Sequence, residues 1–185
     1  MTRYARWGFA LVLLPLVACG GNEETAANTT PPPAQPPMPQ LSSADTSFIN
    51  QAAIAGQAEV QEGQLAEKRG LGPAVRQFAQ HMVTDHSRVN QQLMQLAQSK
   101  GVTPPSAPDP EAVAQVQVLE RLHGRAFGRQ YVRDQVTAHQ QAVQLFQQEA
   151  AQGSDPDVKA FAQQTVPTLQ EHLQMVEGLS GKPHH

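Results

Sequence analysis

Three histidines and one glutamate interrupt the apolar stripes of the long helical patterns in this sequence, one in each pattern. They are Glu59, His86, His139 and His172. Imidazole and carboxylate groups are the ligands that hold zinc, iron, copper or manganese between helices. The pattern therefore predicts a mononuclear metal site, or another polar ligand site, with these four side chains as ligands.

Two further carboxyl groups lie next to these ligands in the sequence. Asp85 precedes His86, and Glu62 follows Glu59 by nearly one helical turn. Carboxylates in such positions orient metal-bound imidazoles through hydrogen bonds, so we expect Asp85 and Glu62 to support the ligands from the second shell or to add a ligand.

The same residues also have a purely structural interpretation. Buried histidines are commonly held by hydrogen bonds, and Gln135 and Thr165 lie on the same stripes. Against this, an uncompensated glutamate in an apolar core costs several kcal/mol, which a cation or a protonated histidine offsets. The sequence leaves both interpretations open. It contains no GxSxG, HExxH or phosphate-cradling glycine loop, so we predict no catalytic residue.

Long amphipathic helices must position these side chains. Apolar residues at helical spacing predict helices over about 45–69, 73–101, 126–151 and 157–179, and no segment has the alternation of a strand. Glycine and proline residues near 70–73 and 153–156 predict short turns that close two hairpins. The fold class is therefore all-α.

The connection between the second and third long helices is different in length. Residues 100–125 contain a loop followed by a short helix that begins near Asp109, and this segment is long enough to travel the length of a bundle. We therefore predict a ferritin-like four-helix bundle, in which two antiparallel hairpins are joined by a long crossover containing a short helix.

The depth of each polar residue follows from counting along the helices. Glu59, His86 and His139 fall at ~18–23 Å from one end of the predicted bundle. His172 falls about five residues off this level at 1.5 Å per residue. Pro167 lies inside the last helix and should kink it.

The N-terminal region predicts export and lipid attachment. Residues 1–18 combine Arg3 and Arg6 with an apolar run that is too short to span a bilayer, as in a signal peptide. Residues 16–19, LVAC, resemble the lipobox of bacterial lipoproteins, which implies cleavage before a lipidated Cys19. No Asp follows Cys19, so we expect the outer membrane, on the periplasmic face.

Composition then sets the domain limits and excludes some partners. We predict a signal peptide at 1–18, a lipidated cysteine and proline-rich tether at 19–42, the bundle at 43–180 and a tail at 181–185. Cys19 is the only cysteine, so the domain has no disulfide. The net charge of −3 gives no basic surface for nucleic acid, and membrane contact is expected through the lipid anchor alone. The sequence names no protein partner.

Four segments carry a family resemblance: AEVQEGQLAEKRG, VRQFAQHMVTDHSRVNQQLMQLAQSKG, GRAFGRQYVRDQVTAHQQAVQLF and VKAFAQQTVPTLQEHLQMV. In this order they resemble the bacterial domain of unknown function family 4142, over about Asp45 to Leu179. The resemblance implies a ferritin-like fold, a secreted or outer-membrane-associated protein and no established activity. The polar positions that match the family are Glu59, Asp85, His86, His139 and His172.

The sequence departs from ferritin-like di-iron enzymes. Such enzymes carry an ExxH motif on the second and fourth helices, where this chain has Val83 and Leu169 at the glutamate positions. We therefore do not expect di-iron chemistry. Two functional hypotheses follow. In the first, the core site of the lipoprotein serves metal handling or stress tolerance in the cell envelope. In the second, the protein is a structural or interaction lipoprotein whose His/Glu network only fixes helix packing.

Overall fold

A computed structural model describes residues 41–69, 72–107 and 109–181 of the chain. The predicted signal peptide, Cys19 and nearly all of the predicted tether lie outside these residues. In the described ranges every regular element is a helix, which confirms the predicted all-α class. The helices are α1 (Ser43–Lys68), α2 (Pro73–Ser99), α3 (Pro110–Arg121), α4 (Gly124–Gln152) and α5 (Pro156–Ser180). None of them is long and apolar enough to cross a membrane.

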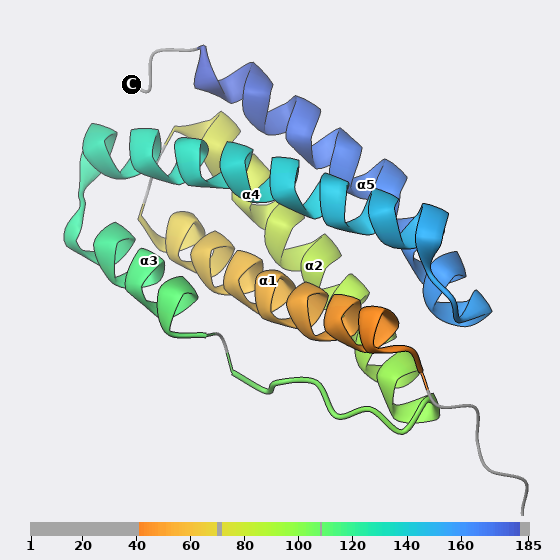
Figure 1. Cartoon of the computed structure of the whole chain (residues 1–185). Coiled ribbons are helices and arrows are strands. Elements are labelled where there is room, and N and C mark those ends of the chain that lie inside the picture. Colours follow the sequence, from red (N-terminus) through yellow and green to blue (C-terminus); the bar gives the residue numbers. More distant parts are fainter. Residues whose placement is uncertain (1–40, 70–71, 108, 182–185) are drawn as a thin grey trace, which may run out of the picture. The chain divides into compact units, whose positions relative to one another are not determined.

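The four long helices form two antiparallel pairs, as Figure 1 shows. The most extensive packing is between α1 and α2 and between α4 and α5. The pairs contact each other through α1 with α4 and through α2 with α5. The segment between α2 and α4 returns along the outside of the helices, and its short helix α3 packs mainly on α1.

Local capping explains where the helices begin. Asp109 and Asp155 accept hydrogen bonds from backbone amides at the starts of α3 and α5, as N-cap residues do. The start of α1 is set by a capping box, in which Ser42 and Asp45 each accept from the other's backbone amide. The spacing of apolar residues had placed the start of α1 at about Asp45. The helix begins two residues earlier, at Ser43.

The C-terminal end of α1 is held against the end of α3 by Arg69. Its guanidinium donates to the backbone oxygens of Leu122 at 2.9 Å and Glu120 at 2.6 Å, and lies 5.5 Å from the ring centroid of Phe127. It also contacts His123 Nδ1 at 3.0 Å. This anchoring fixes α3, and the positive φ of Gly124 (51°) then allows the chain to turn into α4.

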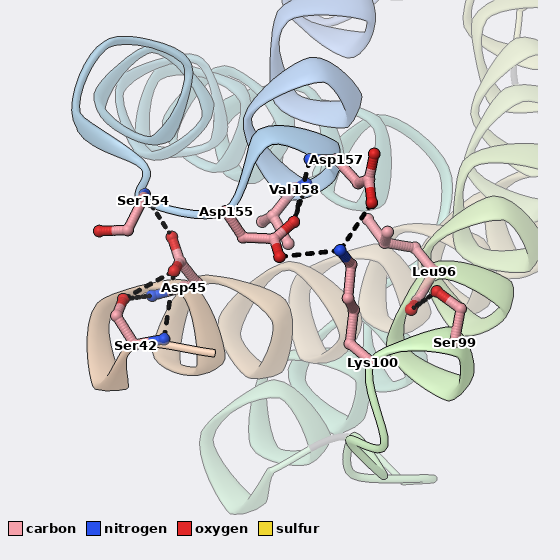
Figure 2. A network of polar contacts seen from close by, with 9 residues as sticks. All are labelled: Ser42, Asp45, Leu96, Ser99, Lys100, Ser154, Asp155, Asp157 and Val158. Carbon is pink, nitrogen blue, oxygen red and sulfur yellow. Dashed lines mark hydrogen bonds and ion pairs between the residues drawn. The ribbon is translucent and has the colours of Figure 1, made fainter. Parts of the chain in front are cut away.

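At the opposite end of α1, polar side chains join three helices, as Figure 2 shows. Asp45 accepts from the backbone amide of Ser154, in the turn between α4 and α5. Lys100, after the end of α2, donates to Asp155 at 2.8 Å and to Asp157 at 2.6 Å. The network therefore holds the first turn of α5 against the ends of α1 and α2.

Two apolar clusters fill the interior of the helices. One cluster centres on Phe78, Phe127 and Tyr131, and the other on Phe48, Phe146 and Leu93. Along each long helix, the residues between these clusters are polar and buried. They are Glu59 and Glu62 on α1, His86 on α2, Gln135 and His139 on α4, and His172 on α5. The apolar clusters thus enclose a polar layer, which contains all of the sequence-predicted ligands.

Candidate metal centre

The three core histidines converge on one point in the polar layer. His86, His139 and His172 each offer one ring nitrogen, and these nitrogens all lie within 4.8 Å of one another. The side chains are 5%, 0% and 2% exposed, so water is nearly excluded from them. Their helices belong to both antiparallel pairs, with α2 in one pair and α4 and α5 in the other. His172 joins the group even though helix counting placed it off level, and α5 continues through Pro167.

Hydrogen bonding fixes which nitrogen of His139 can bind a metal. Its Nδ1 lies 2.9 Å from the backbone oxygen of Gln135, one turn earlier on α4. A carbonyl oxygen only accepts, so Nδ1 carries the proton and Nε2 of the neutral ring carries the free lone pair. That Nε2 lies 3.4 Å from Nε2 of His86. The lone pair of His139 is therefore directed at His86, toward the centre of the group.

His172 is oriented in a comparable way by Asp85. Its Nε2 lies 3.1 Å from Oδ2 of Asp85, and this carboxylate also accepts from Arg88 at 3.2 Å. The carboxylate fixes the proton on Nε2, which leaves Nδ1 of His172 as the lone-pair nitrogen. This Nδ1 is buried and has no hydrogen-bond partner. A buried nitrogen without a partner is costly, and a bound cation would satisfy it.

Burial keeps the histidines in the neutral form that metals bind. It lowers the pKa of His86 well below the usual value, and the neighbouring His139 and His172 lower it further. Burial also lowers the pKa of His139 to about 4. For His172 burial lowers the pKa, although the hydrogen bond to Asp85 acts in the opposite direction. All three rings are therefore neutral at pH 7.

The geometry of the group fits a single ion. Two imidazole nitrogens bound to one metal at ~2.0–2.1 Å in tetrahedral geometry lie ~3.3 Å apart. The distance of 3.4 Å between His86 Nε2 and His139 Nε2 is close to this value. Each neutral imidazole has one unprotonated nitrogen that can bind a metal. Three such rings are a donor set that suits zinc, copper, iron or nickel.

Glu59 lies beside this group but outside the three-histidine cluster. Its Oε1 is 3.8 Å from Nδ1 of His139, on the side of the ring that faces away from His86. Burial raises the pKa of Glu59 to about 7, and its Oε2 has no hydrogen-bond partner. In this conformation the Glu59 carboxyl group lies next to His139, on the far side of its ring from the point where the three histidines converge. Glu59, predicted as a fourth ligand, is therefore farther from that point than the histidines are.

Glu62 and Gln135 extend the polar layer away from the histidines. Gln135 donates from Nε2 to Oε2 of Glu62 at 3.0 Å, while its Oε1 has no partner. Burial and the nearby Glu59 raise the pKa of Glu62 to about 8. The hydroxyl of Tyr131, one turn before Gln135, is also buried without a partner.

Sequence reasoning did not identify two of these contributions. It considered Gln135 only for its side chain, whereas the backbone oxygen orients His139, and no side-chain pattern reveals a backbone acceptor. The hydroxyl of Tyr131 also lies buried near Glu59 and Glu62, and no residue spacing in the sequence marks it as part of the polar layer. Asp85, which was expected to support the ligands, contacts His172 and Arg88.

Fold and site together define a class of all-helical protein in which two antiparallel helix pairs enclose a buried three-histidine cluster. The chain belongs to the family described as Domain of unknown function (DUF4142), whose profile matches residues 30–179. This confirms the family resemblance found in the sequence. A search of curated proteins gives no match.

Solved structures with a similar fold include three informative cases. A DUF305 fragment from Deinococcus radiodurans has a TM-score of 0.69 at 20% identity, covering 77% of this chain and 99% of that one. CopM in the Cu(I)-bound form has a TM-score of 0.62 at 16% identity, with 73% and 94% coverage. CopM in the Cu(II)-bound form gives 0.63 at 15%, with 74% and 95% coverage. At these identities the similarity establishes the helical fold alone.

Proposed function

We propose that this protein binds one transition-metal ion in its core through His86, His139 and His172. The observation that carries the proposal is the convergence of three buried imidazoles whose ligand nitrogens lie within 4.8 Å of one another. Asp85 orients His172 and the Gln135 carbonyl orients His139, as residues behind metal ligands do. Glu59 adds a carboxyl group that offsets the charge of the cation.

Copper is the first ion to test. Imidazole suits copper and zinc, and the group contains no thiolate that would favour an iron–sulfur or structural zinc site. The fold similarity to CopM, whose structures are described as Cu(I)-bound and Cu(II)-bound, supports the choice of copper. Zinc, iron and manganese are the comparison ions.

We further propose that the protein handles or buffers metal in the bacterial envelope. The LVAC motif at residues 16–19 supports a lipid anchor at Cys19, and the lack of Asp after it supports the outer membrane. The two helix pairs with their long connection support a ferritin-like four-helix bundle as the carrier. A buried site with three protein ligands and no identified substrate fits binding better than turnover.

Metal analysis of a background variant tests the proposal. The background carries Cys19→Ser, His184→Ala and His185→Ala, which remove other strong ligands near the chain ends. After reconstitution with Cu(I) or Zn²⁺ and desalting, we expect about one ion per chain, because the three histidines converge on a single point. The His86→Ala/His139→Ala variant should lose the ion, with helix content checked by circular dichroism.

A matched control replaces the two remaining histidines outside the core, His81 and His123, which are exposed. The His81→Ala/His123→Ala variant should retain the ion. Full retention in the His86→Ala/His139→Ala variant, or far less than one ion in the background, would support the alternative in which the polar layer only fixes helix packing.

A further inference from the structure

A cavity of about 520 Å³ lies between α1, α4 and the beginning of α3. Its walls also include residues of α2, among them His86, and Leu169 of α5. The crossover closes over this side of the protein, where Gln57 donates to the backbone oxygen of Pro105 at 2.9 Å. The cavity therefore lies between the outer crossover and the polar layer.

The inner wall of this cavity includes part of the proposed metal site. Glu59, Glu62 and His86 line it, whereas His139 and His172 do not. His139 is 0% and His172 2% exposed, so an ion that approached through the cavity would meet His86 first. The cavity thus leads to one defined side of the three-histidine cluster.

The charge of the walls suits a cation. Asp109 and Glu111 at the start of α3 supply the negative charge of the cavity wall, and no lysine or arginine lines the cavity. Glu59 and Glu62 line it deeper in, where burial favours their protonated forms in the metal-free protein. A second cavity, of about 410 Å³ on the α2–α5 side, is lined by Arg88 and Asp157, whose charges are opposite, and by no histidine. Fixed negative charge along a low-dielectric passage raises the local concentration of cations, which favours the first cavity as their route.

Small side chains keep the passage open. Ala55 and Ala58 on α1 and Ala138 and Ala142 on α4 line it, so a larger residue at any of these positions would narrow it. Ala55 is exposed and Ala138 is half-buried, which makes them tolerant positions for a bulky replacement.

We propose that this cavity is the passage by which the metal cation enters and leaves the core site, with His86 as the first ligand it meets. The proposal rests on the metal-binding function above. The ligand is a small hydrated cation. It passes the acidic residues of the wall and then exchanges bound water for the imidazole of His86. A passage changes the rates of loading and release without changing the bound state.

Stopped-flow absorbance with Co²⁺, whose visible bands report coordination, tests the passage in the Cys19→Ser/His184→Ala/His185→Ala background. Ala138→Phe and, independently, Ala55→Phe should slow loading and release by the same factor, about tenfold or more. The dissociation constant should stay within about threefold, since a blocked path affects both directions equally. A variant that merely distorts the site would instead weaken binding.

The matched control is Ala160→Phe, the same replacement in the wall of the α2–α5 cavity. It should leave both rates unchanged. Unchanged rates in both Ala55→Phe and Ala138→Phe, or equal slowing in Ala160→Phe, would overturn the passage.

Charge gives a second, independent test. Glu111→Gln should slow Co²⁺ loading by about twofold to threefold at low ionic strength, and the difference should vanish at high salt. Glu120→Gln is the control, because Glu120 is exposed on the same helix but does not line the cavity. Equal effects of the two variants would contradict the role of the acidic wall.

The failure of the passage and the failure of metal binding give different results. If the background takes up no Co²⁺, Cu(I) or Zn²⁺, the metal site itself is wrong and the passage with it. If the background binds one ion but the plugged variants load at its rate, the site stands and only the passage is wrong.

Discussion

His86 and His139 come from different helix pairs, yet their Nε2 atoms lie 3.4 Å apart in the core. His139 already donates through Nδ1 to the Gln135 carbonyl, so its Nε2 can only accept. Two arrangements satisfy both nitrogens. Either Nε2 of His86 carries a proton and donates it to Nε2 of His139, or both nitrogens bind one cation between them. This contact between the two helix pairs is thus one that a metal ion would complete.

Asp85 should control metal affinity although it is not among the clustered ligands. Asp85→Ala removes the acceptor that fixes the proton on Nε2 of His172, so the dissociation constant should rise about 10-fold to 100-fold, as for other residues that orient metal ligands. Competition titration with a chromophoric chelator measures this. Arg88→Ala, which removes only the exposed partner of Asp85, should have little effect. Equal affinities of Asp85→Ala and the parent would rule out this role.

The metal-free protein should lose stability as the pH rises from about 6.5 to 8. The folded protein holds protons on Glu59 and Glu62, whose pKa values are raised to about 7 and about 8, and the unfolded chain has released them. The free energy of unfolding should therefore fall with rising pH, by up to about 1.4 kcal/mol per pH unit for each group.

Glu62→Gln removes one of these protons and should flatten that decline, as measured by urea unfolding at several pH values. Glu149, whose pKa burial raises to about 7, contributes in the same direction in both proteins. The exposed Glu120→Gln is the control. An identical pH slope for Glu62→Gln and the parent would contradict the assignment. Below pH 6.5 the buried histidines act in the opposite direction, because the unfolded chain then binds the protons.

Asp45 should contribute more to stability than an ordinary surface carboxylate, because it is buried and joins two helix ends. It is 1% exposed, accepts from Ser42 in the capping box and accepts from the Ser154 amide in the α4–α5 turn. Asp45→Ala should lower the free energy of unfolding by about 1–3 kcal/mol. Asp157→Ala removes an exposed partner of Lys100 and should cost less than about 1 kcal/mol. Similar losses in the two variants would show that Asp45 contributes no more than a surface ion pair.

Two helical glycines should respond oppositely to alanine. A Cβ on Gly63 would lie 2.9 Å from Val83 Cγ2 and 3.2 Å from the Ala79 oxygen, so Gly63→Ala should destabilise the α1–α2 packing by about 1–3 kcal/mol. A Cβ on Gly178 meets nothing within 4 Å, and Gly178→Ala should add about 0.5–1 kcal/mol through helix propensity. Thermal unfolding measures both. A stabilising Gly63→Ala would refute the close packing.

The helices could be predicted because their signals are local. Proline at the first position of α2, α3 and α5, with Asp109 and Asp155 as N-caps, set those starts within a residue or two. The start of α1 was misplaced because its capping box uses Asp45 at the third position, where an apolar stripe gives no signal. The inward face of α1 is also hard to assign from sequence: Ala55 is exposed, whereas Gly56 is buried where α1 approaches Asn90. Alanine and glycine have too little side chain for hydropathy to distinguish the faces.

The site could be predicted only to the level of the helix faces. Spacing placed all four candidate residues inward, and each is buried. Counting along straight helices placed His172 off level, whereas the centroid of its ring lies 5.4 Å from that of the His86 ring. No spacing rule fixes the side-chain torsions of Glu59. The orienting contacts of Asp85 and of the Gln135 backbone oxygen depend on tertiary approach, so they became visible only in the structure.

Anomalous diffraction from a crystal of the copper-loaded or zinc-loaded protein tests the central claim most directly. We predict one buried peak, bound at ~2.0–2.1 Å by Nε2 of His86, Nε2 of His139 and Nδ1 of His172. Asp85 and the Gln135 carbonyl should still hold the opposite nitrogens of His172 and His139. Three histidines that keep their contacts with no ion between them, at full metal occupancy elsewhere on the chain, would contradict the account.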